Sequence, residues 1–402
     1  MKKNKSKNFF TILSFLGIYL LSTGVSFAVF DYLKEPPQII EESKTESVSK
    51  EDLLVDVSGP KTETCLLNGQ KFTEAEKEAW SKRRPLAVMI ENHEEARPQS
   101  GLSRADVVYE AVAEGGTTRF MALFYCDVVA RETIVGPVRS ARTYFLDWAS
   151  EYGETPLYVH VGGAHCDLET KQGCLNGAKA DALGQIREYG WEGENDFNQF
   201  SIGYPTFWRD YERLGRTVAT EHTMYSTTER LWSVAKERGW TNKDPEGNNW
   251  QASFTPWQFK EEPTSQGEES TEIVFDFWEG YKNMEVKWLY QEEEGVYRRS
   301  NGEESHKDLN NQQQLEAKNI VVQFMKESPA NDGYPGNVHL LYGTIGEGKA
   351  LVFQDGRAIE AKWIKRNRKD RTKFYNSQGQ EIKFNPGKIW IEIIPVEAEV
   401  SY

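Results

Sequence analysis

Short apolar runs alternate with amphipathic stretches along the chain from residue 73 to about residue 245. Short runs of apolar residues between polar ones are typical of buried strands, and they occur here at 86–90, 118–125 and 157–161. Apolar residues at helical spacing between capping residues predict helices, here at 73–80, 141–152, 178–189 and 227–238. Because strands and helices alternate, we expect residues 73–245 to form a mixed α/β domain.

Beyond residue 250 the helical spacing disappears, and short strand-like runs follow one another. These runs lie at 273–278, 284–290, 319–324, 338–342, 350–353, 358–364 and 389–394. Asp355 and Gly356 stand between two of them, and this residue pair is a strong signal for a tight hairpin turn. The sequence therefore predicts a β-rich C-terminal domain at residues 255–398 and an α+β fold class for the chain.

The N-terminal residues have the pattern of a membrane segment. Lysines at positions 2, 3, 5 and 7 precede an uncharged run, residues 9–30, that is long enough to span a bilayer as a helix. The lysines place the N-terminus inside and the body outside the cytoplasm. We therefore expect residues 1–30 to be an uncleaved transmembrane anchor and residues 31–72 a linker. Because Ser26-Phe27-Ala28 also fits a signal-peptidase site, cleavage after Ala28 and secretion is the alternative.

Composition narrows the class of protein further. Hydrophobic residues at 38% and aromatic residues at 12% supply enough apolar surface for folded cores, which excludes wholesale disorder. The 62 acidic and 48 basic residues give a net charge of -14. We expect no nucleic-acid partner, because a general nucleic-acid binder needs a basic face. A local basic pocket is compatible with this net charge.

Four cysteines fit the oxidising conditions outside the cytoplasm. Cys166 and Cys174 bracket a short polar loop and are the expected disulfide, which would leave Cys65 to pair with Cys126. Four cysteines allow three connectivities, and the sequence alone does not choose among them. His165 beside Cys166 makes a zinc site a competing interpretation. Because the chain has no CxxC pair, we expect neither a metal nor another cofactor.

Arginines stand beside glycines in three neighbouring stretches, at 97–110, 114–119 and 136–142. A planar guanidinium group binds carboxylate or phosphate with two hydrogen bonds. Gly136 and Pro137 would place Arg139 at a turn that runs into a helix, where free N–H groups also favour anions. Arg139 and Arg142 would then share one helix face. We therefore expect an anion-binding cleft lined by Arg97, Arg104, Arg119, Arg139, Ser140, Arg142 and Arg209.

A structural role for the same arginines is the alternative hypothesis. Arg97, Arg119 and Arg139 would then form salt bridges with nearby glutamates, namely Glu91, Glu110 and Glu114. A second polar cluster stands in the C-terminal part, at Arg298, Arg299, His306 and Asp308.

Two histidines bear on whether the chain is an enzyme. His160 ends a predicted strand before Gly162, and His222 follows Glu221, so each is a candidate general base beside the arginines. The sequence contains no serine elbow and no HExxH motif. The first hypothesis is thus a membrane-anchored envelope protein that binds an anionic cell-wall component or an envelope protein. The alternative is an envelope hydrolase or transferase acting on a phosphodiester, peptide or glycan.

Several of these stretches together resemble the YerB-like lipoprotein family, a bacterial envelope family with a two-part domain of unknown function. The matching segments are 84–93, 97–110, 114–119, 136–142, 207–210, 348–356 and 385–387, with His222. The resemblance covers roughly residues 80–398 and implies an envelope location and a two-part body, without an activity to carry over. Because no cysteine closely follows the hydrophobic segment, we expect the transmembrane helix to replace the lipid anchor of that family.

Overall fold

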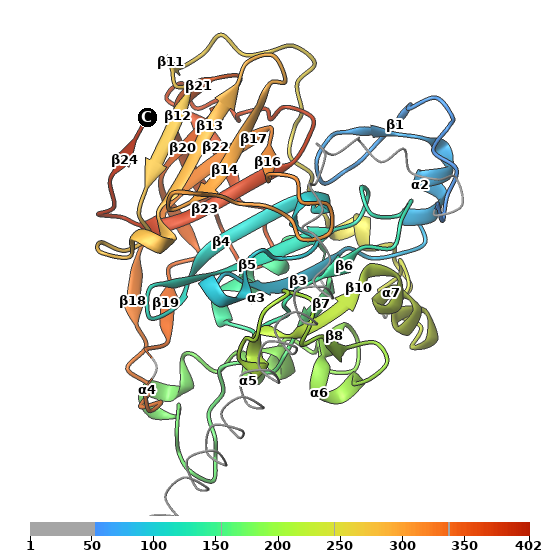
Figure 1. The fold of residues 1–402 in the computed structure, drawn as a ribbon, viewed down its shortest axis with the longest axis vertical. Coiled ribbons are helices and arrows are strands. Elements are labelled where there is room, and N and C mark those ends of the chain that lie inside the picture. Colours follow the sequence, from blue (N-terminus) through green and yellow to red (C-terminus); the bar gives the residue numbers. More distant parts are fainter. Residues whose placement is uncertain (1–52, 154, 245, 337) are drawn as a thin grey trace, which may run out of the picture. The chain divides into compact units, whose positions relative to one another are not determined.

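A mixed sheet of eleven strands organises the computed structural model, which describes residues 53–402 except residues 154, 245 and 337. Across the sheet the strands are β11 (Glu268–Glu269), β21 (Arg357–Lys365), β20 (Gly346–Gln354), β17 (Asn319–Met325), β23 (Ile389–Pro395), β4 (Val107–Glu114), β5 (Thr117–Phe124), β3 (Leu86–Glu91), β7 (Leu157–His160) and β8 (Asp196–Asn198). The last of the eleven, β22 (Lys373–Asn376), pairs with β21. The fold is α+β, and strands of both halves of the chain share this sheet (Figure 1).

The two halves of the sheet join at β4 and β23. Strand β23 runs parallel to β17 on one side and to β4 on the other, with Glu392 opposite Glu110. Figure 1 shows the red β23 beside the cyan β4. Strand β4 is not among the predicted strands, although residues 107–113 are apolar except for Glu110. This junction joins segments far apart in the sequence, so no local pattern indicates it.

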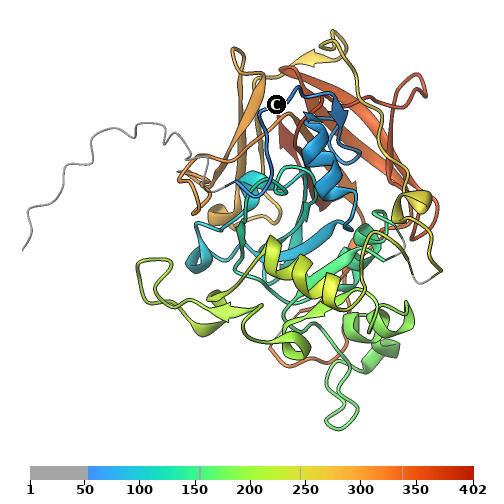
Figure 2. The ribbon, with the colours of Figure 1, turned by 90° about the vertical axis from the view of Figure 1, so that its right-hand side faces the viewer.

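A second sheet of six strands covers the C-terminal part. It consists of β15 (Glu304–Ser305), β14 (Val296–Asn301), β13 (Val286–Gln291), β12 (Glu272–Phe275), β24 (Val400–Ser401) and β16 (Glu316–Ala317). The smaller sheets pair β6 (Ile134–Val135), β10 (Met224–Thr227) and β9 (Trp208–Arg209); β18 (Glu327–Pro329) and β19 (Leu340–Tyr342); and β1 (Glu63–Thr64) and β2 (Lys71–Phe72). In Figure 2 the orange and red strands lie above the green segments.

The helices are short. They are α2 (Glu74–Trp80), α3 (Thr143–Ala149), α4 (Leu175–Ala178), α5 (Ala182–Glu188), α6 (Gln199–Ile202) and α7 (Thr228–Glu237). The predicted cap of α2 is confirmed, since Thr73 and Glu76 form a capping box. The predicted helix at 178–189 is wrong in its first turn, because Asp181 caps α5 only from Ala182 onward. The predicted turn at Asp355 and Gly356 is confirmed, and both residues have positive φ.

The predicted anchor, residues 1–30, lies outside the described residues. Among the residues that the structure describes, no helix has the length and apolar character needed to cross a membrane. The predicted linker at 31–72 is described from Leu53 onward, and this part is packed on the body. Leu54 N donates to Ala130 O at 2.9 Å, and β1 pairs with β2.

Two disulfides are present, and both predicted pairs are confirmed. Cys65–Cys126 ties the β1–β2 hairpin to the end of β5 across 61 residues of sequence. Cys166–Cys174 closes a loop of only 8 residues. All four cysteines of the chain are therefore oxidised, so no thiol is left to bind a metal.

A fully buried ion cluster fills the space between the two large sheets, where β4 meets β23. Arg299 on β14 donates from Nη2 to Glu110 Oε2 at 2.6 Å, and its Nε lies 3.6 Å from Glu392 Oε1. Burial and the neighbouring Glu110 raise the pKa of Glu392 well above its ordinary value, which favours its protonated form. Trp288 Nε1 donates to Glu392 Oε1 at 2.9 Å. Arg299 thus neutralises the remaining carboxylate.

His306 extends the cluster toward the loop before β4. Its Nδ1 accepts a hydrogen bond from Arg299 Nη1 at 2.6 Å, and its Nε2 donates to Gln99 Oε1 at 2.7 Å. Burial and the Arg299 charge hold the pKa of His306 well below its usual range. Each ring nitrogen of the neutral imidazole therefore has a matching partner.

Removing the buried cation should destabilise the protein strongly. We expect Arg299→Met to lower the free energy of unfolding by about 3–5 kcal/mol, because it leaves Glu110 buried without a counter-charge. Arg298, the next residue, pairs with Glu294 at the surface, and Arg298→Met should change stability by less than about 0.5 kcal/mol. Urea unfolding of both variants measures the difference. Equal losses in the two variants would contradict a central role for Arg299.

The two disulfides should contribute unequally to stability. In the chain-entropy model, a double alanine substitution at Cys65 and Cys126 removes about 4 kcal/mol, and one at Cys166 and Cys174 about 2–3 kcal/mol. The reason is the larger loop that Cys65–Cys126 closes in the unfolded chain. Urea midpoints of the two oxidised variants test the order. A larger loss from the Cys166–Cys174 variant would refute it.

Candidate anion-binding site

The segment that carries Arg139 and Arg142 crosses the ends of β3 and β7 in an extended conformation. Arg139 N donates to Met89 O at 2.9 Å, and Ala141 N donates to Gly162 O at 2.9 Å. Arg142 is the N-cap of α3, with φ -135°, and the helix begins only at Thr143. The expectation that Arg139 and Arg142 share a helix face is therefore wrong. Backbone hydrogen bonds to two strands hold this segment extended.

Arg119 and Arg142 close on one carboxylate. Arg142 Nη2 donates to Glu114 Oε2 at 2.7 Å, and Arg119 Nη2 donates to Glu114 Oε1 at 3.3 Å. Arg119 Nη1 also donates to Ser140 O at 2.8 Å, and both arginines are buried. Although burial alone would raise it, the two guanidinium groups hold the pKa of Glu114 at about 2. These two arginines therefore have the contacts of structural salt bridges.

Arg139 is anchored at one end and open at the other. Its Nε donates to Glu91 Oε1 at 3.0 Å, and about a quarter of the side chain, 24%, is exposed. Within the described part of the chain, no acceptor pairs with its two terminal nitrogens. Arg209 on β9 is likewise held at one nitrogen, with its other guanidinium nitrogens open. Its Nη1 donates to Thr220 O and Thr223 Oγ1, and no described acceptor pairs with its Nε or Nη2.

Arg139 and Arg209 line the same cavity. This cavity, which we call the Arg139–Arg209 cavity, has a volume of about 510 Å³ and is also lined by Ser140 and Phe200. Phe200 on α6 is 75% exposed. Glu221 lines the cavity too, and a backbone hydrogen bond together with His222, Arg139 and Arg209 lowers its pKa. Three of the predicted ligand-binding residues, Arg139, Ser140 and Arg209, thus come together here.

His160 does not open into this cavity. Its side chain is fully buried, with Nδ1 2.6 Å from Gly162 O and Nε2 2.6 Å from Asp196 Oδ1. His222 lies on the other side of Glu91, with Nδ1 2.8 Å from Glu91 Oε2. The hydrogen bond with Glu91 raises the pKa of His222. Glu91 therefore holds Arg139 with one oxygen and His222 with the other.

Arg97 belongs to the junction between the sheets. Its Nε donates to Asn92 Oδ1 at 3.0 Å and its Nη1 to Asn283 O at 2.9 Å. Burial and the charge of Arg299 lower the pKa of Arg97 to about 10. Because Asn92 Nδ2 also donates to Glu110 Oε1 at 3.0 Å, Arg97 is linked to the buried ion cluster. The structure does not bring it to the Arg139–Arg209 cavity.

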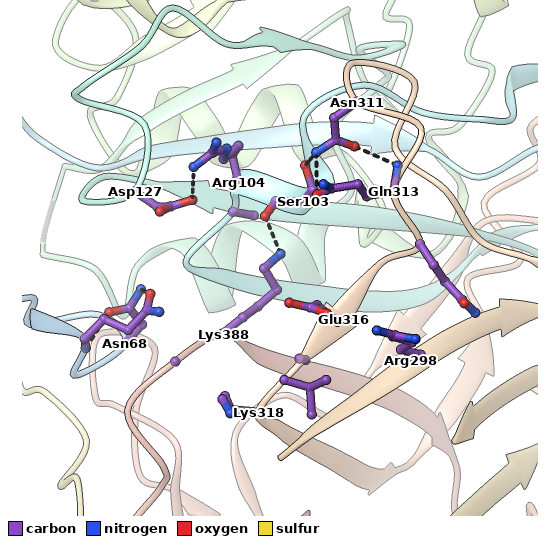
Figure 3. A pocket seen from close by; sticks show the side chains of 16 residues that line it. Asn68, Ser103, Arg104, Asp127, Arg298, Asn311, Gln313, Glu316, Lys318 and Lys388 are labelled. Atoms are coloured by element: carbon purple, nitrogen blue, oxygen red, sulfur yellow. Dashed lines mark hydrogen bonds and ion pairs between the residues drawn. The ribbon is translucent and has the colours of Figure 1, made fainter. Parts of the chain in front are cut away.

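Arg104 lines a different cavity, of about 670 Å³, between residues of the two halves of the chain (Figure 3). Arg104 Nη1 lies 3.4 Å from Asp127 Oδ2, and Lys388 Nζ donates to Ser103 O at 2.7 Å. Arg298 and Lys318 both contact Glu294, through its carboxylate and its carbonyl respectively. Arg104 and Arg298 each pair with a carboxylate through a terminal nitrogen, whereas both terminal nitrogens of Arg139 are open and Arg209 donates only to neutral oxygens.

Comparison with known proteins finds relatives that match most of the chain. Models described as "Protein of unknown function (DUF3048)" match with their N-terminal domain at residues 72–241 and their C-terminal domain at residues 274–391. The Bacillus subtilis (strain 168) protein named "Putative lipoprotein YerB" is 30% identical over 333 residues, which are 83% of this chain and 85% of that protein.

The crystal structure of YerB from Bacillus subtilis matches the fold with a TM-score of 0.63 and 28% sequence identity. The match covers 85% of this chain and 100% of that one. Both matched segments contribute strands to the central sheet, the first through β3, β4 and β5 and the second through β17, β20 and β21. The resemblance seen in the motifs is thereby confirmed: the chain belongs to the DUF3048 family of YerB-like proteins.

Proposed function

We propose that this protein is an extracytoplasmic component of the bacterial envelope, held at the membrane by residues 1–30, that binds an anionic envelope ligand in the Arg139–Arg209 cavity. The lipoprotein name of its Bacillus subtilis relative supports a location at the membrane. In this chain the first cysteine is Cys65, so the uncharged run at 9–30 supplies the attachment. The ligand class is a phosphate or carboxylate group of a cell-wall component or an envelope protein.

The open end of Arg139 is the observation that carries this proposal. Glu91 is 4% exposed and fixes the Nε side of the guanidinium group, so the fork is held before a ligand arrives. A pre-positioned donor loses less conformational entropy on binding than a free side chain. Two parallel N–H groups match the geometry of a carboxylate or phosphate. Arg209 adds a second cation on the same cavity.

The contacts of the histidines favour binding over the hydrolase or transferase hypothesis. A general base needs a ring nitrogen within reach of the substrate proton. Both nitrogens of His160 are occupied by Gly162 and Asp196, and the ring has no exposed surface. His222 uses Nδ1 for Glu91. Neither candidate base, His160 nor His222, lines the Arg139–Arg209 cavity, whereas Arg139 and Arg209 do.

Neutralising the open arginines should weaken anion binding without unfolding the protein. We expect Arg139→Gln and Arg209→Gln each to lower the affinity for inorganic phosphate by about 10–100-fold, because a hydrogen bond to a charged group contributes about 1.5–3 kcal/mol. Titration calorimetry at constant ionic strength measures the affinity, and thermal unfolding checks the fold.

Arg238→Gln, at the exposed end of α7, is the matched control for this experiment. It removes the same charge from the surface and should leave phosphate affinity unchanged. Equal losses in all three variants would mean that phosphate senses only the general field of the protein. Unchanged affinity in Arg139→Gln and Arg209→Gln would refute the site.

The membrane anchor is tested separately. We expect N-terminal sequencing of the protein from the membrane fraction to show that the mature chain begins before position 29. The reason is that the uncharged run is retained as a transmembrane helix. A mature chain that begins at Val29 would show cleavage after Ala28 and contradict the anchor.

A further inference from the structure

Two histidines and a glutamate converge beside Glu91. His93 and Glu95 lie at the short 3-10 helix Glu94–Ala96, and His222 ends the 3-10 helix Thr220–His222. One potential ligand atom from each of the three side chains lies within 4.8 Å of the other two. The rings of His93 and His222 are stacked, with centroids 4.9 Å apart and planes inclined by 10°. Side chains far apart in the sequence thus present metal-ligand chemistry at one place.

The hydrogen bond to Glu91 orients His222. With Nδ1–H donated to Glu91 Oε2 at 2.8 Å, the neutral ring keeps its lone pair on Nε2, which lies 3.4 Å from Glu95 Oε2. Arg139 holds the other oxygen of Glu91, so this carboxylate is itself fixed. A metal-binding histidine commonly donates its second nitrogen to a carboxylate in this manner. The partner that orients a metal ligand is therefore present.

Glu95 has the freedom that closing around an ion requires, whereas His93 is held by its cap on the 3-10 helix and by its stacking on His222. Glu95 has a side chain that is 52% exposed, and His93 accepts a hydrogen bond from Glu95 N at 3.2 Å. Zinc binds imidazole nitrogen at about 2.0–2.1 Å and carboxylate oxygen at about 2.0–2.2 Å. The ligand atoms of the three side chains lie within 4.8 Å of one another, so binding an ion requires the His93 ring and the Glu95 side chain to turn toward His222.

We propose that His93, Glu95 and His222 bind one divalent transition-metal ion of the zinc class. Imidazole and carboxylate ligands suit zinc, whereas calcium and magnesium prefer oxygen ligands alone. Three protein ligands leave a coordination position open for water or another ligand. Because Glu91 supports both His222 and Arg139, the ion lies next to the Arg139–Arg209 cavity. The alternative without a metal is an ion pair between His222 and Glu95.

The test uses the full chain, purified without a histidine tag, oxidised, and stripped of metal with a chelator. Competition with a chromophoric chelator measures zinc affinity and stoichiometry. We expect one zinc ion per chain, and a loss of affinity of at least tenfold in His93→Gln and in Glu95→Gln. His165→Gln is the matched control, because His165 is an exposed histidine outside the cluster. The zinc affinity of this variant should equal that of the wild type.

Two further measurements exclude a folding artefact. Zinc should raise the thermal midpoint of the wild-type chain, because a ligand that binds only the folded state stabilises it. It should not do so in His93→Gln, whose metal-free midpoint should equal that of the wild type. Cobalt should give visible absorption bands without thiolate charge transfer. No zinc binding by the wild type, wild-type affinity in both ligand variants, or a loss confined to His165→Gln would each overturn the proposal.

Discussion

The parallel pairing of β4 with β23 puts two glutamates side by side in a dry interior, and one arginine makes that pairing possible. Glu110 and Glu392 are register partners, and neither side chain has exposed surface. Burial beside Glu110 favours the protonated form of Glu392, and Arg299 pairs with Glu110. The arginine comes from the second sheet, so this contact also fixes how that sheet packs on the first.

This constraint explains why the two matched segments form one body. Glu110 belongs to the first segment and Arg299 to the second, and Glu392 directly follows the end of the second segment. Either segment alone would lack the oppositely charged partner that the other supplies. The predicted boundary near residue 250 marks a real change in local pattern, but the sheet continues across it. Local hydrophobic spacing shows what kind of element forms and says little about which strand it pairs with.

Local signals in the sequence were sufficient for the elements that depend on local chemistry. Thr73 with Glu76 located α2, and Asp355 with Gly356 located the β20–β21 hairpin. The roles of the arginines were not predictable in this way, because burial and partner decide them. Arg119 and Arg142 share Glu114, and Arg97 joins the junction, while Arg139 and Arg209 remain open. The support of Arg139 and His222 by Glu91 joins residues from three distant segments, so no spacing motif could reveal it.

Arg119 and Arg142 are closed by Glu114, whereas Arg139 and Arg209 are open to an anion. The position of a bound anion tests this division most directly. Crystals soaked in selenate should show an anomalous selenium peak between Arg139 and Arg209, where guanidinium nitrogens have no described protein acceptor. The Arg104 cavity in Figure 3, where Arg104 and Arg298 pair with carboxylates through terminal nitrogens, should show none. A peak at Arg104 and none at Arg139 would contradict the account.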